Sequence, residues 1–161
     1  MITRYILVFL YLIIITYHIM INELRTSILE ELGSIDNLAE IYDWIPEKFN
    51  GFPSLFFNFD RIESQVLDSN HHERVYYFTI NIFQETTTLS SILAERNLCY
   101  LLDQIISVFD RSDFHGLAIK VDAVGGNISA VETESWPALH ASIVLWIHTG
   151  FALCDYKKIS N

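Results

Sequence analysis

The stretch VYYFTINIFQET, residues 75–86, limits the possible folds more than any other part of the sequence. Its side chains alternate with period two, which is the repeat of a β-strand. One face would carry only large apolar side chains, and the other would mix apolar with polar ones. The first face comprises Tyr76, Phe78, Ile80 and Ile82, and the second comprises Val75, Tyr77, Thr79, Asn81 and Phe83. The pattern predicts a strand with one face buried in a core.

Two more strands are predicted upstream, over residues 41–45 and 52–59. Between them lies Asn50-Gly51, which we interpret as a tight turn because both residue types tolerate positive φ. In the second segment, Leu55, Phe57 and Phe59 alternate with other residues, so this strand also has a core face.

Helical spacing of apolar residues predicts two helices, over residues 21–33 and 90–111. Ser90 or Ser91 can cap the second helix. Its expected buried stripe consists of Leu98, Leu101, Leu102, Ile105, Val108 and Phe109.

Two last strands are predicted within residues 116–124 and 138–151. The order of helix, three strands, helix and two strands favours an α+β fold. We expect two helices on one face of a mostly antiparallel sheet of four to five strands. The polar segment Arg61–Arg74 is expected to form the outer part of a long hairpin that projects from the body.

The chain has 161 residues, which suits a single domain, and its formal net charge is −10. Such an acidic chain is not expected to hold nucleic acid by neutralising phosphates. Cys99 and Cys154 lack metal-ligand spacing and are expected to be reduced core residues, which favours a cytosolic compartment.

No sequence motif for catalysis, a cofactor or a metal is present, so the residues do not exclude an enzyme but give no argument for one. His71 and His72 are adjacent and would point to opposite faces of a strand, so a solvated hairpin tip is the preferred interpretation. His140 and His148 are expected to be half-buried, each with a backbone partner. Glu132 and Glu134 could pair as carboxylates, although a solvated acidic face is the more usual arrangement.

Residues 1–19 form an apolar leader. Because residues 5–21 carry no formal charge, this run could be a membrane anchor or an additional packed element. A third interpretation is that translation starts at Met20. The main domain is then expected over residues 20–155, followed by a polar tail at 156–161.

Several segments in this order resemble the tail terminator (tail-completion) proteins of long-tailed bacteriophages, of which the lambda-type terminator is typical. The segments are MINELRTSILEEL, IYDWIPEKFNGFPSLFF, ERVYYFTINIFQET, ERNLCYLLDQIISVFD and, more loosely, HASIVLWI. Each match is weak alone, and their order and spacing over about residues 20–151 carry the resemblance. Members of that family lack a leader like residues 1–19.

The resemblance implies an α+β subunit of a hexameric ring in the virion, assembled in the host cytoplasm. Such a ring caps the tail tube, ends its polymerisation and joins it to the head–neck complex. The implied partners are other copies of the chain, the tail tube protein and a connector or neck protein. The net charge predicts a lumen lined more by Asp and Glu than by Lys and Arg, so that DNA would pass through it without specific binding. No membrane partner is expected. The resemblance also implies a protein that is not an enzyme and needs no cofactor. The alternatives are a head-completion or neck connector, a membrane-anchored α+β domain and, last, a hydrolase that uses Cys99 or a histidine.

The candidate interface residues lie on the second face of the sheet, on the long hairpin and in the acidic stretch that follows the fourth predicted strand. They are Phe56, Arg61, Glu63, Asp68, His71, His72, Arg74, Glu132 and Glu134.

Overall fold

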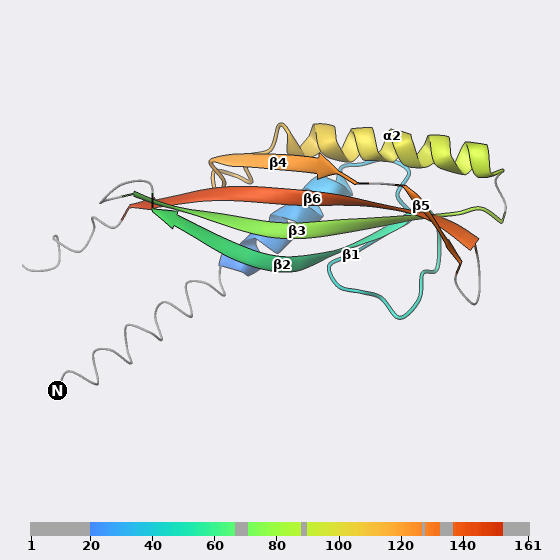
Figure 1. Ribbon diagram of the computed structural model, residues 1–161, viewed down its shortest axis with the longest axis horizontal. Helices are drawn as coiled ribbons and strands as arrows, with labels where there is room; N and C mark the ends of the chain where they lie inside the picture. The colour runs from blue at the N-terminus through green and yellow to red at the C-terminus, as the bar shows by residue number, and fades with distance from the viewer. Residues whose placement is uncertain (1–19, 67–70, 88–89, 127, 133–136, 153–161) are drawn as a thin grey trace, which may run out of the picture.

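The computed structural model describes residues 20–66, 71–87, 90–126, 128–132 and 137–152. The first helix covers residues 20–33. The elements that follow are β1 (Glu40–Tyr42), β2 (Ser54–Val66), β3 (His71–Glu85), α2 (Ser91–Phe109), β4 (Lys120–Gly125), β5 (Ser129–Glu132) and β6 (Pro137–Ala152). This arrangement confirms the predicted α+β fold, with the first helix crossing the sheet and α2 running beside β4 (Figure 1).

All six strands of the described residues belong to one sheet, in the order β1-β2-β3-β6-β4, and β5 pairs with β6 beyond the end of β4. The β1–β2 pair is parallel, and every other pair is antiparallel. The two long strands β3 and β6 are paired along their whole length, from His71 opposite Ala152 to Glu85 opposite Ala138. The sheet therefore has one strand more than we predicted, because the short strand β5 was not recognised.

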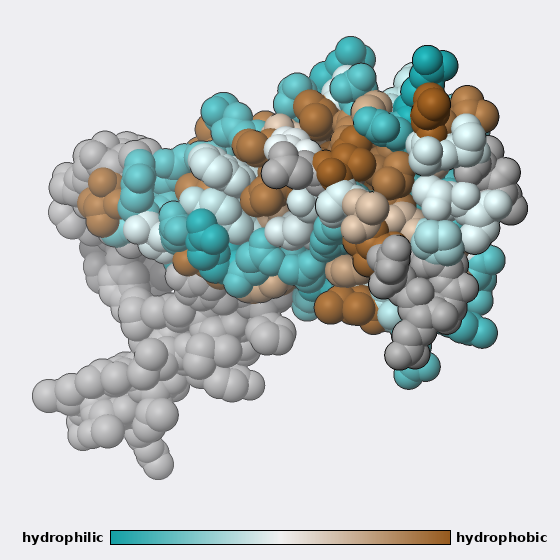
Figure 2. Space-filling model, turned by 45° about the vertical axis from the view of Figure 1, so that its right-hand side comes forward, coloured by the Kyte–Doolittle hydropathy of each residue, from teal (hydrophilic) through white to brown (hydrophobic). Residues whose placement is uncertain are grey.

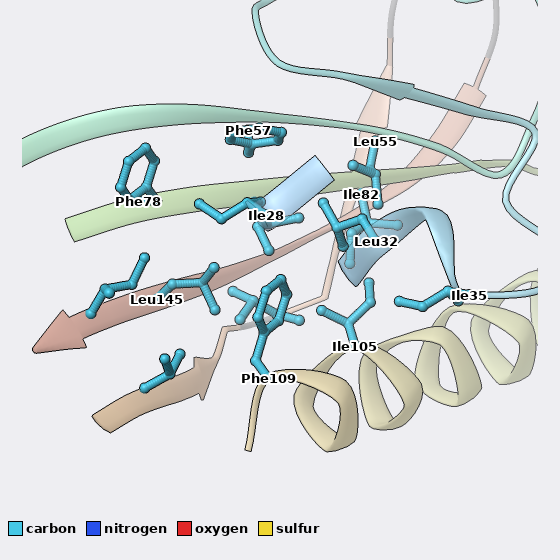
Figure 3. Close-up of a cluster of buried hydrophobic side chains, with 14 of the residues drawn as sticks. Ile28, Leu32, Ile35, Leu55, Phe57, Phe78, Ile82, Ile105, Phe109 and Leu145 are labelled. Carbon is cyan, nitrogen blue, oxygen red and sulfur yellow. The ribbon is translucent and has the colours of Figure 1, made fainter. Parts of the chain in front are cut away.

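The core lies between the sheet and the two helices (Figure 3). Ile28 and Leu32 of the first helix meet Ile105 and Phe109 of α2 and the inward side chains of the strands, such as Phe57. The whole predicted apolar face of β3 is fully buried, namely Tyr76, Phe78, Ile80 and Ile82. Both helices thus cover the same face of the sheet, as predicted.

Helix α2 begins where its sequence predicts. The side chain of Ser90 accepts a hydrogen bond from the backbone N–H of Leu93, at 3.4 Å, and so satisfies one of the free donors of the first turn. The buried stripe contains Leu98, Leu101, Ile105 and Phe109 of the predicted set, whereas Leu102 and Val108 are only partly buried.

The interpretation of Asn50-Gly51 as a tight turn with positive φ is wrong. Neither residue has positive φ, and β1 runs parallel to β2, so the two strands are not a hairpin. Residues 43–53 instead carry the chain back to the start of β2. Asn50 instead binds β1: its backbone N–H and its side-chain amide donate to the two carboxylate oxygens of Glu40, at 2.9 and 3.1 Å.

The long hairpin is present, but it is supported by a third strand. β2 and β3 pair out to Val66 opposite His72, and β6 runs alongside them. These three strands extend past both described helices at the left of Figure 1. His71 and His72 are both β3 residues paired with β6. The side chain of His72 is half-buried, so the prediction of a solvated tip is wrong for His72, whereas the side chain of His71 lies outside the described residues.

Cys99 is exposed, which corrects the prediction that it is a core residue. Cys154 lies outside the described residues, as do residues 1–19 and the polar tail at 156–161. Among the helices of the described residues, none is both long enough and apolar enough to cross a membrane.

Candidate functional site

The sheet has a second face, which we call the open face because no described helix packs on it. Period two places there the residues that alternate with the core set. On the central strands these are Tyr77, Thr79, Asn81 and Phe83 of β3, and His140, Ser142, Val144, Trp146 and His148 of β6. They lie beside Phe56 and Asn58 of β2 and Asp122 of β4. The open face is the candidate site, since all four strands contribute side chains to it.

One end of the open face is an aromatic cluster. Phe56 stacks on Phe83 with ring centroids 5.8 Å apart, and Phe83 also contacts His140 at 4.8 Å. Phe49, from the segment before β2, packs on Phe83 at 5.1 Å and on Phe52 at 5.7 Å. Phe56 therefore lies on the face of the sheet opposite to that of the buried Phe57, as the alternation predicts. Its neighbours leave it half-buried.

A chain of hydrogen bonds occupies the middle of the open face. The imidazole Nε2 of His140 lies 3.0 Å from Oδ1 of Asn81, whose amide donates to Asn58 at 3.3 Å. The amide of Asn58 and the hydroxyl of Thr79 both donate to the carboxylate of Asp60, at 2.5 and 2.6 Å. These side chains fix one another across three strands, so the face presents an ordered pattern of polar groups.

At the far end of the open face, Tyr77 is surrounded by charged and aromatic groups. The Arg61 guanidinium lies over its ring, 4.0 Å from the centroid, and Trp146 packs beside it at 5.6 Å. The Tyr77 hydroxyl donates to Glu63 at 2.8 Å, and Arg61 Nε donates to the other oxygen of that carboxylate, also at 2.8 Å. The hydrogen bond from Tyr77, followed by that from Arg61, lowers the pKa of Glu63. The hydrogen bond between Tyr77 and Glu63 also raises the pKa of Tyr77.

His148 joins three strands next to this group. Its Nδ1 lies 2.6 Å from the Glu73 carboxylate of β3, and its Nε2 lies 3.3 Å from the Asp122 carboxylate of β4. The second contact is short enough for an ion pair but is not aligned as a hydrogen bond. Lys120 holds the same carboxylate at 2.6 Å. A shallow cleft of about 460 Å³ opens here, between Trp146, His148 and the two glutamates Glu63 and Glu73.

His140 and His148 are half-buried, as predicted, but the expected backbone partners are wrong. Their partners are the side chains of Asn81, Glu73 and Asp122, because a ring on the open face points away from the backbone of its own strand.

The structure brings together only some of the nine candidate interface residues. Arg61 and Glu63 form one group at one end of the open face, and Phe56 lies at the other end of that face. His72 and Arg74 lie on β3 at positions that alternate with the open face. Asp68 and Glu134 lie outside the described residues, and so do the side chains of His71 and Glu132.

Sequence reasoning missed Trp146 as a surface group and Asp122 as the neighbour of His148. The alternation in residues 138–151 is the signal that could have placed Trp146 and His148 on one face. In the described part of the chain, no group of three or more His, Cys, Asp or Glu residues could hold a metal ion.

His140 provides a prediction about pH. Burial lowers the pKa of His140, because the charged imidazole is less well solvated there than in water. The pKa of His140 is lower in the folded state than in the unfolded state, where it is about 6.5. The free energy of unfolding therefore suffers no loss from His140 above about pH 6.5, and it falls as the pH drops through the pKa of the folded state. We expect His140→Gln to flatten this acid-side loss, as measured by urea unfolding from pH 8 down to pH 5. An unchanged pH slope would contradict the assignment.

No protein-family model matches the chain, and no curated protein matches it either.

Proposed function

We propose that this chain is a structural virion protein whose copies form a ring, hexameric by the resemblance, that caps a phage tail tube. The ring ends tube polymerisation and joins the tube to the head–neck complex. The observation that carries the proposal is the open face, which presents Phe56, Phe83 and Trp146 together with ordered polar groups. Aromatic side chains mixed with hydrogen-bonding groups are typical of protein interfaces.

The two layers of the subunit suit such a task. A tube grows by adding identical rings, so stopping it needs a ring that matches the tube on one side only. In this subunit, helices cover one face of the sheet and leave the other to the aromatic and polar groups described above. Six copies with this arrangement would present two different surfaces, one to the tube and one to the neck.

The distal extension of β2, β3 and β6 is the part we assign to the tube or the neck. It reaches past both helices (Figure 1) and carries the cleft beside Trp146 and His148. Its exposed side chains are mostly polar or charged, including Arg61 and Glu63. A formal charge of −10 per subunit agrees with a lumen through which DNA passes without binding.

The first test removes the gene from the phage that encodes the chain and examines the lysate by electron microscopy. We expect overlong tails without heads, because nothing ends polymerisation of the tube. Tails of normal length beside unjoined heads would instead indicate a head-completion or neck connector. Normal virions would exclude both structural functions.

A point variant then connects the function to the open face. Trp146 is 40% exposed on the open face, and Ile92 is 64% exposed on α2. We expect Trp146→Glu to fold and to assemble but to leave tails overlong, because a carboxylate would be desolvated at the tube contact. The matched Ile92→Glu variant should restore normal tails. Equal rescue by both variants would remove the open face from the mechanism.

A further inference from the structure

The visible side of the surface in Figure 2 mixes apolar and hydrophilic side chains, so composition alone marks no site on it. A buried polar atom without a hydrogen-bond partner is rarer, because leaving such an atom unpaired costs free energy. Gln84 of β3 has an atom of this kind. The residue is only 3% exposed, and its Oε1 has no hydrogen-bond partner in the described part of the chain.

The orientation of the Gln84 amide follows from its neighbour. Its Nε2 donates to the backbone carbonyl of Glu85 at 3.3 Å, and a carbonyl can only accept. The nitrogen is therefore the atom on the Glu85 side, which leaves the oxygen as the unpaired acceptor. Because this hydrogen bond is long, the amide can turn by a small angle without losing a strong interaction.

Gln84 forms part of the wall of a hollow where α2 meets the end of the sheet. The hollow has a volume of about 380 Å³. Four segments that are far apart in the sequence contribute to it: the chain after the first helix, the chain before β2, strand β3 and helix α2. The residues that line it are Asn37, Pro53, Gln84, Asn97, Tyr100 and Leu101.

The lining combines three side-chain amides with an aromatic ring, and none of the described residues that line the hollow carries a charge. The amides belong to Gln84 and to the exposed residues Asn37 and Asn97, and each amide can both donate and accept. Tyr100 is 59% exposed, so its ring offers an open apolar face. The Tyr100 hydroxyl accepts a hydrogen bond from the amide of Gln104 at 3.3 Å, which holds the ring in place.

These groups determine which kind of ligand fits. A charged ligand would lose water and meet no opposite charge in the lining. A purely apolar ligand would leave the three amides without partners. A neutral sugar ring meets both requirements, because its hydroxyl groups donate and accept as the amides do. Its C–H face can also lie on an aromatic ring, whose face is electrically negative.

We propose that this hollow is a binding site for a neutral pyranose sugar. One sugar hydroxyl donates to Oε1 of Gln84 after a small turn of the amide, and other hydroxyls bond to Asn37 and Asn97. The C–H face of the sugar lies on the Tyr100 ring. A side-chain amide of another protein would also satisfy Gln84, but its single oxygen and single nitrogen engage the two asparagines less completely. The inference goes beyond the proposed function and does not depend on the ring.

The first experiment measures binding to the full chain by saturation-transfer difference NMR and then by titration. The probes are glucose, galactose, mannose and xylose, with acetamide in place of a protein side-chain amide. We expect at least one sugar to bind saturably and acetamide to bind more weakly than that sugar. If none of the four sugars binds, the proposal is overturned. Tighter binding of acetamide than of every sugar would also overturn it and would assign the hollow to a protein side chain.

Three variants then locate the binding. Gln84→Met removes the buried acceptor but keeps a side chain of similar length, so it should fold and bind the sugar about tenfold more weakly. Asn97→Ala, at the exposed rim, should also weaken binding. Asn22→Ala is the matched control, because Asn22 is exposed on the first helix and does not line the hollow.

The control should bind the sugar as the wild type does, and thermal unfolding checks that each variant is folded. Wild-type affinity in a folded Gln84→Met variant would overturn the proposal. If that variant does not fold, Asn97→Ala decides, and the proposal fails when Asn97→Ala and Asn22→Ala bind the sugar equally well.

Discussion

Replacing Leu98 with aspartate should prevent the chain from reaching its native fold. Leu98 is fully buried in the stripe of α2 that faces the sheet. Removing a buried leucine side chain costs about 2–5 kcal/mol, and an unpaired buried carboxylate adds a further penalty of several kcal/mol. The whole stability of a domain is only about 5–15 kcal/mol. We therefore expect Leu98→Asp to lose its cooperative thermal transition in circular dichroism.

The neighbouring residue provides the control. Cys99 is exposed, and it lies in the same helix interior, so aspartate lowers helix propensity there by a similar amount. Cys99→Asp should cost well under about 1 kcal/mol and keep a sharp transition. Equal damage by the two variants would mean that α2 does not pack on the sheet through the Leu98 stripe.

These two residues also show what the sequence could and could not predict about the helix. Residues in an α-helix turn by about 100° each, so position 99 leaves the stripe formed by 98, 101 and 105. The periodicity contained this information, but the apolar character of cysteine outweighed it in our prediction. Where we followed the period alone, as for Tyr76 and Phe78 in β3, the buried face was correct.

Strand pairing was harder to predict than strand position. Asn50-Gly51 is a strong local signal for a tight turn, yet the parallel pairing of β1 with β2 decides the conformation there. β5 was missed because its four residues are too few to show a period. Both errors arise because pairing partners are distant in the chain, whereas turn and alternation signals are local.

The candidate site was predicted in the same uneven way. Phe56 follows from alternation within one segment, and Arg61 and Glu63 were chosen for their place on the hairpin. A register shift between Phe59 and Arg61 brings these two residues onto the open face, which strict alternation would not predict. The contacts of His148 with Glu73 and Asp122 join residues from β3, β4 and β6, and they depend on the order of strands in the sheet. The packing of the whole domain sets the order of the strands, so no short sequence motif predicts the contacts of His148 with Glu73 and Asp122.

A methyl group added at Gly126 should destabilise the fold, and this prediction tests the β4–β6 edge of the sheet. A Cβ at this position would lie 2.6 Å from the Ser142 hydroxyl and even closer to the Ser142 carbonyl oxygen. The backbone cannot simply retreat, because the N–H of Gly126 donates to that same carbonyl at 2.6 Å. We expect Gly126→Ala to destabilise the fold by about 1–3 kcal/mol, as overpacking of a fitted contact usually does.

Gly125 is the matched control, one residue earlier in the chain. A Cβ there would meet only Ile106 Cδ1 at 3.6 Å, which is an ordinary contact. Alanine should therefore be neutral or slightly stabilising, because it reduces the freedom of the unfolded chain. For a domain of this size, each 1 kcal/mol lowers Tm by about 2–4 °C, so differential scanning calorimetry should separate the two variants clearly. Equal Tm values for Gly125→Ala and Gly126→Ala would show that β6 does not approach residue 126 as closely as described.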